Sequence, residues 1–378
     1  MDRRVFCQKV AIVGGSIAIA PIIKACSPIR TSPPQDSVPP TKFAKSKPDS
    51  SPVAADMAPA TSTLTSEAGP TAVILDDPGF TKIALVRTRD RSQGVREALR
   101  LLEYGGIKGD NVLLKPNFNS ADESPGSTHI DTLRALIGEL QENGAGTITV
   151  GDRSGMGHTR SVMQQKGIDT LAADLGLTLV AFDELEDEEW TVIRSNDHHW
   201  QDGFAVPRIL LDAHRVVQTC NLKTHRYGGH FTMALKNSVG LAAKRTANRD
   251  HDYMSELHNS VHQRKMIAEI NTAYKPDLIV MDGIEAFVTG GPDNGRRVSP
   301  EVIVAGKDPI AVDAVGVAIL RYFGTTPEVS KGSVFDQEQI ARAVELGVGI
   351  SSPDLIQILT SGEGSLEFAD QLNSILLS

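Results

Sequence analysis

A basic segment that contains adjacent glycines carries the residues best suited to chemistry in this chain. Asn221–Gly240 reads NLKTHRYGGHFTMALKNSVG and follows the apolar pair Val216-Val217. Between Asn221 and Asp250, six Lys or Arg residues stand against one acid, although the whole chain has a formal net charge of −9. A positive segment built around glycines favours an anionic ligand. The sequence therefore predicts that an anionic small molecule binds here.

Two side chains of this segment are candidates for catalysis. Lys223 is suited to binding an anion or to acting as an amine nucleophile. His225 is suited to general acid–base catalysis or to binding a metal. The alternative is that both are exposed polar residues that follow a strand.

The glycine pair suggests a second feature of the same site. We expect a helix over Phe231–Leu241 that begins at Gly228–Gly229, where free backbone N–H groups would bind an oxyanion. Lys236 and Asn237 would lie on this helix. The alternative is that the two glycines form a simple turn, and the segment does not match a Walker sequence.

Polar residues also follow four strands that we expect in a parallel sheet. These strand ends are Lys115-Pro116-Asn117, Gly151-Asp152, Asn221–His225 and Asp282-Gly283. In open parallel sheets, ligands bind beyond the carboxyl ends of the strands. We therefore expect one shared pocket, in which Asp152 and Asp282 could bind a divalent metal that polarises the substrate or generates a nucleophile.

Five further residues are weaker candidates. Asp308 precedes Pro309 and is either a helix N-cap or a ligand-binding group, with Asp313 five residues further on. His129 could close over the pocket. His258 and His262 have the i, i+4 spacing that would place both on one helix face, where they could bind a metal; two surface residues are the alternative.

The elements that must position these residues predict an α/β fold. Strands are expected near residues 82–86, 111–114, 147–150, 177–182, 215–220, 278–281, 302–305 and 356–359, with helices between most of them. This alternation predicts a mostly parallel sheet with helices on both faces. Residues 190–211 look like β-structure laid over the main sheet, which predicts an embedded β-rich lobe.

The first 72 residues are expected to lie outside the fold. Residues 1–26 resemble a twin-arginine signal peptide, with Arg3-Arg4 before an apolar stretch and Cys26 in a lipobox-like sequence as the acylated residue. A general secretory signal is the alternative. Residues 27–72 hold 23 Ser, Thr or Pro among 46 residues and predict a disordered linker. We expect the twin-arginine machinery to export the protein to the cell envelope, where a lipid anchors it to the membrane.

Composition excludes several classes of function. Residues 73–378 carry a formal charge of −12, which argues against nucleic-acid binding because that function needs a basic face. Cys220 is the one cysteine in this part of the chain, so the sequence predicts neither an intramolecular disulfide nor a cysteine-ligated iron–sulfur cluster.

The order of several motifs resembles a known family. KPN, a Thr-His pair, GD after a strand, NLKTH, ALKNSVG, VMDGIEAF with GGP, and KDPIAVDAV are similar to the domain-of-unknown-function family 362 over Thr81–Phe323. Some members carry ferredoxin-type cysteine modules, which residues 73–378 lack. The resemblance implies that the family's characteristic positions are Lys115, His129, Asp152, Lys223, His225, Lys236, Asn237, Asp282, Asp308 and Asp313.

Two classes of function remain open from the sequence. One is an exported enzyme that acts on an anionic small molecule, with Lys223, His225, Asp152 and Asp282 as catalytic residues and a divalent metal as a candidate cofactor. The other is a lipid-tethered protein that binds an anionic solute or assists the assembly of another exported protein. The His and Asp residues at strand ends favour the enzyme, because anion capture needs donors rather than carboxylates.

Overall fold

The computed structural model describes residues 79–246 and 251–378. The predicted leader, the linker and Cys26 lie outside these described residues. Within the described part of the chain, no helix is long and apolar enough to cross a membrane.

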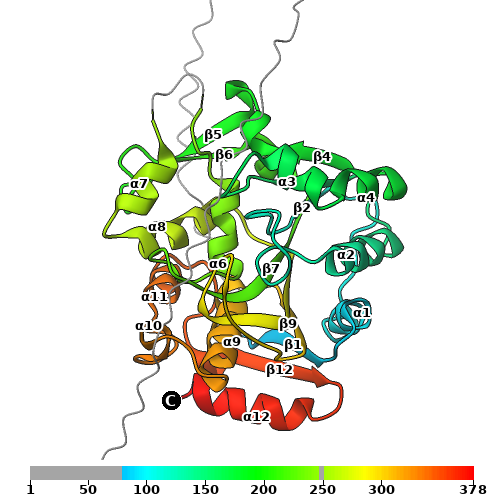
Figure 1. Ribbon diagram of the computed structural model, residues 1–378, viewed down its shortest axis with the longest axis vertical. Coiled ribbons are helices and arrows are strands. Elements are labelled where there is room, and N and C mark those ends of the chain that lie inside the picture. The colour runs from blue at the N-terminus through cyan, green and yellow to red at the C-terminus, as the bar shows by residue number, and fades with distance from the viewer. Residues whose placement is uncertain (1–78, 247–250) are drawn as a thin grey trace, which may run out of the picture. The chain divides into compact units, whose positions relative to one another are not determined.

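One mixed sheet forms the centre of the fold, and its main path has the order β12-β1-β11-β9-β7-β2-β3-β4 (Figure 1). Strand β11 pairs antiparallel with β1 and β9, and the other neighbours on this path are parallel. The predicted mostly parallel α/β fold is therefore confirmed. The strands of this path are β1 Thr81–Arg87, β2 Val112–Lys115, β3 Ile148–Asp152, β4 Thr178–Ala181, β7 Arg215–His225, β9 Leu278–Gly290, β11 Val302–Gly306 and β12 Ile356–Ser361.

Strands β7 and β9 extend well beyond their predicted ends. Their parallel pairing continues past a register shift between Asn221 and Lys223, where Lys223 pairs with Phe287. Two short strands add to their far ends: β8 (His230–Phe231) pairs with β7, and β10 (Gly295–Val298) pairs with β9. Lys223 and His225 are consequently part of β7, and neighbouring strands hold their backbone in place.

Helices cover both faces of the sheet, as the alternation predicts. Apolar side chains of α1, α2, α3 and α4 pack on one face, against Leu114 and Val280 among others. On the opposite face, α9, α11 and α12 pack against residues such as Leu222 and Met281. These helices are α1 Arg91–Leu101, α2 Ile130–Glu142, α3 Thr159–Gln165, α4 Ile168–Leu175, α9 Pro309–Tyr322, α11 Glu338–Glu345 and α12 Ser365–Leu376.

The expected β-rich lobe is a small antiparallel pair, β5 (Trp190–Ile193) with β6 (Phe204–Pro207). It packs with α5 (Arg208–Asp212), α7 (Tyr253–Asn259) and α8 (Gln263–Ile270). The apolar core that these strands and helices form is continuous with sheet residues such as Leu113. The pair is therefore a cover over the sheet and has no separate core of its own.

Two helix predictions are wrong in detail. Between β3 and β4, where the strand–helix alternation predicts one helix, the chain forms α3 and α4, which are divided at Gly167 with a φ of +70°. Phe231–Leu241 is not one helix: β8 ends at Phe231, the short α6 spans Ala234–Asn237, and a 3-10 turn follows over Ser238–Leu241. Pairing with β7 holds residues 230–231 as a strand and delays the start of the helix. The remaining short helix, α10, spans Pro327–Ser330.

Candidate functional site

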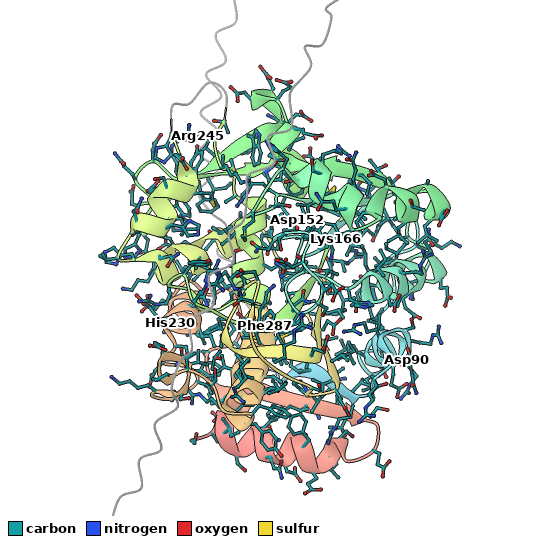
Figure 2. The ribbon with its side chains drawn as sticks, viewed as in Figure 1. Asp90, Asp152, Lys166, His230, Arg245 and Phe287 are labelled. Carbon is teal, nitrogen blue, oxygen red and sulfur yellow. The ribbon has the colours of Figure 1, made fainter. Side chains whose placement is uncertain are left out.

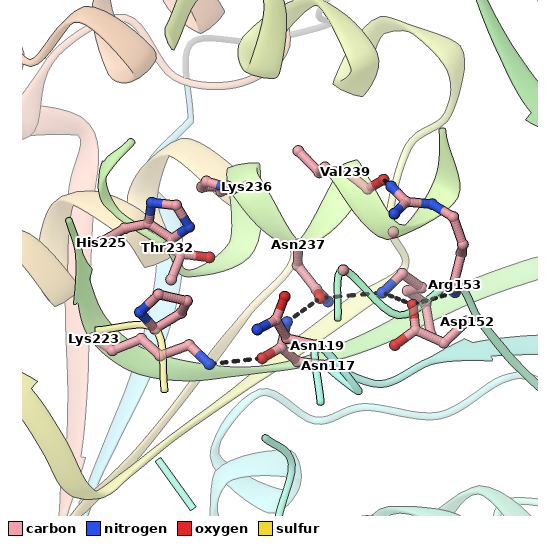
Figure 3. A pocket seen from close by; sticks show the side chains of 14 residues that line it. Asn117, Asn119, Asp152, Arg153, Lys223, His225, Thr232, Lys236, Asn237 and Val239 are labelled. Atoms are coloured by element: carbon pink, nitrogen blue, oxygen red, sulfur yellow. Dashed lines mark hydrogen bonds and ion pairs between the residues drawn. The ribbon is translucent and has the colours of Figure 1, made fainter. Parts of the chain in front are cut away.

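A small polar pocket lies where the ends of β2, β3 and β7 meet α6 (Figure 3). Its free volume is about 50 Å³. One of its residues, Asp152, lies among the side chains in the middle of the fold (Figure 2). The pocket is lined by Lys115, Asn117, Asn119, Asp152, Arg153, Gly155, Lys223, His225, Thr232, Lys236, Asn237, Val239, Gly240 and Pro292.

Lys115 and Asp152 form a buried ion pair at one end of the pocket. The Lys115 Nζ lies 2.7 Å from Asp152 Oδ1, and both side chains are almost inaccessible. Asp152 also accepts hydrogen bonds from the backbone N–H groups of Phe118 and Arg153. Burial raises the pKa of the Asp152 carboxyl, and the Lys115 ammonium and these two donors act against that rise. This carboxylate is therefore already neutralised within the protein.

Lys223 is buried without a carboxylate partner among the described residues. Its Nζ donates to Asn117 Oδ1 at 2.9 Å and to the backbone carbonyl of Gly126. Burial, together with the charge of Lys236, lowers the pKa of Lys223 to about 7. A substantial fraction of this amine is therefore neutral near pH 7.

Asn237 contacts Lys115 directly and is linked to Lys223 through Asn117. Its Oδ1 accepts from Lys115 Nζ and from Asn117 Nδ2, each at 3.2 Å. Its own Nδ2 donates to Gln218 Oε1 and to a backbone carbonyl of β7. Since Asn117 must present its Nδ2 to Asn237, its Oδ1 faces Lys223. The position of the Lys223 amine thus depends on a continuous chain of contacts that ends at Asp152 (Figure 3).

The other end of the pocket holds Lys236 and His225. No hydrogen-bond acceptor or carboxylate contacts the Lys236 amine within the described chain, and burial lowers its pKa to about 8. His225 Nδ1 is buried and has no hydrogen-bond partner among the described residues. Burial, followed by the charges of Lys236 and Lys223, lowers the pKa of His225 well below its usual value. His225 is therefore a neutral imidazole beside two amines.

Gly229 lies close to this end, although it is not a lining residue. A Cβ at Gly229 would lie 2.7 Å from Lys236 Cε and 3.1 Å from His225 Nδ1. A larger residue at this point would therefore displace the Lys236 side chain. A Cβ at Gly228 would instead meet the Gln263 side chain, and Gly228 adopts a φ of +80°. The glycine pair therefore forms a turn with a close approach, and the prediction that it begins an anion-binding helix is wrong.

Arg153 is a pocket residue that the sequence analysis did not single out. Its guanidinium donates to the backbone carbonyls of Ala242 and Val239 and is buried, which lowers its pKa to about 10. Asn119 and Thr232 also line the pocket. The sequence signal that could have identified Arg153 is its position directly after Asp152, at the end of β3.

Asp282 does not join the pocket. It lies within β9 and faces α1 and α2, where its carboxylate contacts Arg91 Nε at 2.8 Å and Thr132 Oγ1 at 2.6 Å. Asp152 and Asp282 therefore do not form the expected metal pair, because each is already paired with a different cation. β9 continues past Asp282, so this residue is not at a strand end.

Asp308 and Asp313 act on helix N-termini outside the pocket. Asp308 is the N-cap of α9 and accepts from the backbone N–H groups of Ala311 and Ile350. Asp313 accepts from the N–H groups of Ala234 and Leu235 at the start of α6. Their expected role in binding a ligand directly is not what the structure shows. Asp313 instead holds the helix that carries Lys236 and Asn237.

The three remaining histidine candidates lie elsewhere. His129 is the N-cap of α2, where its ring accepts from the N–H of Asp131, and it does not line the pocket. His258 belongs to α7, whereas His262 is the N-cap of α8, so the prediction that one helix carries both is wrong. The chain turns between them at Ser260. Among the described residues, no group of three or more His, Cys, Asp or Glu side chains is placed to hold a metal ion.

Comparison with known proteins identifies a sequence relative, a partial structural match and a family. Thylakoid-associated protein sll1697 of Synechocystis sp. is 27% identical over 249 residues, which cover 63% of this chain and 74% of that protein. The lactate racemase apoprotein from Thermoanaerobacterium thermosaccharolyticum is a partial structural match, with 17% identity and a TM-score of 0.40 over 62% of this chain. This chain spans 55% of that structure's length. The model of a family described as a domain of unknown function, DUF362, matches residues 112–318, which include every residue that lines the pocket. The chain therefore belongs to the DUF362 family.

Proposed function

We propose that this protein is an enzyme that acts on a small anionic molecule in this pocket, with Lys223 as its reactive amine. The observation that carries the proposal is the set of partners around Lys223. Its two acceptors, Asn117 Oδ1 and the carbonyl of Gly126, are both uncharged oxygens. A neutral amine has two N–H groups and one lone pair, so two acceptors leave the lone pair free for chemistry.

The charges of the pocket support an anionic ligand. Lys115, Lys223, Lys236 and Arg153 line it together with one carboxylate, Asp152, which Lys115 neutralises. Burial of these side chains strengthens the attraction between the remaining cations and an anion. The Lys236 amine has no hydrogen-bond acceptor among the described residues and lines the pocket, so it is available to contact an anion there.

The titration of Lys223 supports a catalytic role. A general base or nucleophile works best when its pKa lies near the working pH. Burial brings the pKa of Lys223 to about 7, whereas Lys236 has a pKa of about 8. Near neutral pH, Lys223 can therefore accept a proton or attack an electrophile while Lys236 remains largely cationic.

Cyanate tests this proposal, because it is a small anion that carbamoylates neutral amines. We expect the full-length protein at about pH 7 to be modified at Lys223 at least about tenfold faster than at an exposed lysine, since an ordinary amine is almost fully protonated there. Lys331, which is exposed, is the internal control. Peptide mapping by mass spectrometry locates the product, and phosphate should protect Lys223 by competition.

Isothermal titration calorimetry with phosphate and with acetate measures whether the pocket binds anions. Lys236→Met should weaken binding of both anions, and Lys331→Met should leave it unchanged. Equal cyanate reactivity of Lys223 and Lys331 would contradict the role of Lys223 as a reactive amine. Anion binding together with such low reactivity would instead support a binding protein without catalysis.

We also propose that the protein is exported and lipid-anchored at the cell envelope. The supporting observations are the Arg3-Arg4 leader and the lipobox-like position of Cys26, both outside the described residues. The Synechocystis relative is named a thylakoid-associated protein, which supports association with a membrane in general. Cell fractionation tests the proposal: Cys26→Ser should move the protein from the membrane fraction to the soluble one. Equal membrane retention would contradict the anchor.

A further inference from the structure

We propose that Lys223 forms an imine with the carbonyl carbon of a small 2-oxo acid, whose carboxylate lies against Lys236. This inference rests on the proposed function and adds the class of substrate and the bond that forms. It follows from the arrangement of two amines, one neutral imidazole and the size of the pocket. A 2-oxo acid carries its electrophilic carbon directly beside its carboxylate, and Lys223 and Lys236 line the same small pocket.

The first argument concerns the two lysines. Figure 3 shows Lys223, His225 and Lys236 at one end of the pocket, with Asp152 and Arg153 at the other. Placing an amine in a buried site next to another cation is a known way to make it a nucleophile for carbonyl substrates. In this pocket Lys236 is that second cation, and no carboxylate within the described chain forms an ion pair with Lys223. Lys223 is therefore the nucleophile and Lys236 the cation beside it.

The second argument concerns the hydrogen bonds of Lys223 before and after the reaction. The free amine gives one N–H to Asn117 Oδ1 and one to the carbonyl of Gly126. A protonated imine retains a single N–H, which either of these oxygens can still accept. The orientation of Asn117 is independent of the substrate, because Asn237 holds its Nδ2. The same two acceptors can thus orient the amine and then stabilise the product cation.

The third argument concerns size. A free volume of about 50 Å³ corresponds to about three to five water molecules when each needs about 10–15 Å³ on this measure. The enclosed space suits a molecule of few heavy atoms, such as pyruvate. Neutral His225 and Thr232 line the same end and offer polar contacts without adding a negative charge that would repel a carboxylate.

The reaction is a condensation with no change in oxidation state. The Lys223 nitrogen adds to the carbonyl carbon, and one of its protons passes to the carbonyl oxygen, which gives a neutral carbinolamine. The C–O bond then breaks, and the hydroxyl group leaves as water with a proton from the Lys236 ammonium. The nitrogen lone pair forms the C=N bond, so that Lys223 becomes a cationic imine and Lys236 a neutral amine.

Reductive trapping tests this inference on the full-length protein. Pyruvate is added with sodium borohydride, which reduces an imine to a stable secondary amine, and peptide mapping by mass spectrometry locates the adduct. We expect the adduct on the peptide that contains Lys223 and not on that containing Lys331. Since the map is made on the unchanged protein, this result does not depend on whether a variant folds.

Two variants sharpen the test. Lys223→Arg keeps a positive charge but forms no stable imine, so the adduct should disappear, while circular dichroism checks that the fold is retained. Lys236→Met should slow trapping at Lys223, because both the carboxylate partner and the acid for loss of water are removed. Trapping should also increase as the pH rises through about 7, where Lys223 loses its proton.

The outcomes separate this inference from the proposed function. Pyruvate binding by calorimetry and fast cyanate modification of Lys223, without a reducible adduct, would overturn the imine and leave Lys223 as a general base. Adducts spread equally over exposed lysines, or unchanged in Lys223→Arg, would also overturn it. Absence of both anion binding and cyanate reactivity would overturn the proposed function itself.

Discussion

Replacing Lys223 by methionine should stabilise the fold while it removes the reactive amine. The side chain is 1% exposed, and burial lowers its pKa from 10.5 to about 7. At about 1.4 kcal/mol for each tenfold change in proton affinity, this shift costs the folded state on the order of 5 kcal/mol near neutral pH. Methionine has a similar length and no charge, so Lys223→Met removes that cost.

The substitution also leaves two acceptors, Asn117 Oδ1 and the carbonyl of Gly126, without their donor. Each unsatisfied buried acceptor costs about 1 kcal/mol or more. We therefore expect the free energy of unfolding to increase by a net amount of about 1–3 kcal/mol at about pH 6.5, from the two effects together. Functional residues of this kind commonly reduce stability.

The pH dependence provides a sharper measurement than the absolute gain. The unfolded chain holds the Lys223 proton up to the ordinary pKa of 10.5, whereas the folded chain releases it near 7. Because the unfolded state binds more protons between these values, this residue makes wild-type stability rise with pH in that window. The advantage of Lys223→Met should be greatest below about pH 7 and should shrink by about 3 kcal/mol by about pH 9.5.

Urea unfolding followed by circular dichroism at several pH values measures this difference. Lys331→Met, at an exposed position, is the matched control and should change stability by less than about 0.5 kcal/mol at every pH. An advantage of Lys223→Met that does not vary with pH would refute the titration argument. A large loss of stability at about pH 6.5 would show that the two hydrogen bonds outweigh the cost of the buried amine.

Two further substitutions test how the pocket is held together. Gly240→Ala would place a Cβ 2.5 Å from Asp152 Oδ1 and 2.6 Å from Lys115 Nζ. Because this Cβ separates a buried ion pair, the substitution should lower the free energy of unfolding by about 3 kcal/mol or more. A thermal unfolding curve equal to that of wild type would contradict the buried pair. Asp313→Ala removes a helix cap and should lower the free energy of unfolding by about 1–2 kcal/mol. It should also weaken phosphate binding as measured by calorimetry, because α6 would no longer hold Lys236 in place. Unchanged phosphate affinity would show that α6 is positioned without Asp313.

The sequence identified most of the pocket because polar residues at strand ends are a local signal. Lys115, Asn117, Asp152, Lys223 and His225 all follow or end apolar strands, and the parallel order brings these ends to one edge. The same reasoning failed for Asp282. Its strand does not end there, since pairing with β7 and β10 extends β9 to Gly290. Such pairing joins residues far apart in the chain and has no local signature.

Helix ends show a similar division. Of the two roles left open for Asp308, the structure shows the helix N-cap of α9, which fits the local pattern of an Asp-Pro pair at a helix start. The start of α6 could not be predicted in the same way, since Asp313 reaches its N–H groups from a helix almost eighty residues later (separation 79). The sequence predicted free backbone amides at Gly228–Gly229. In the structure the helix starts later, and its first amides donate to Asp313.

The sequence by itself determined the α/β class, the family resemblance and which residues carry reactive groups, because each depends on residue type, spacing and apolar periodicity. Only the tertiary structure decided which charges remain free for a ligand. Asp152, Asp282 and Asp313 look alike in the sequence, yet folding pairs them with Lys115, with Arg91 and with the α6 amides. Lys223 and Lys236 receive no such carboxylate partner within the described chain. Burial without a counter-charge makes an amine reactive, and it arises only when distant segments pack together.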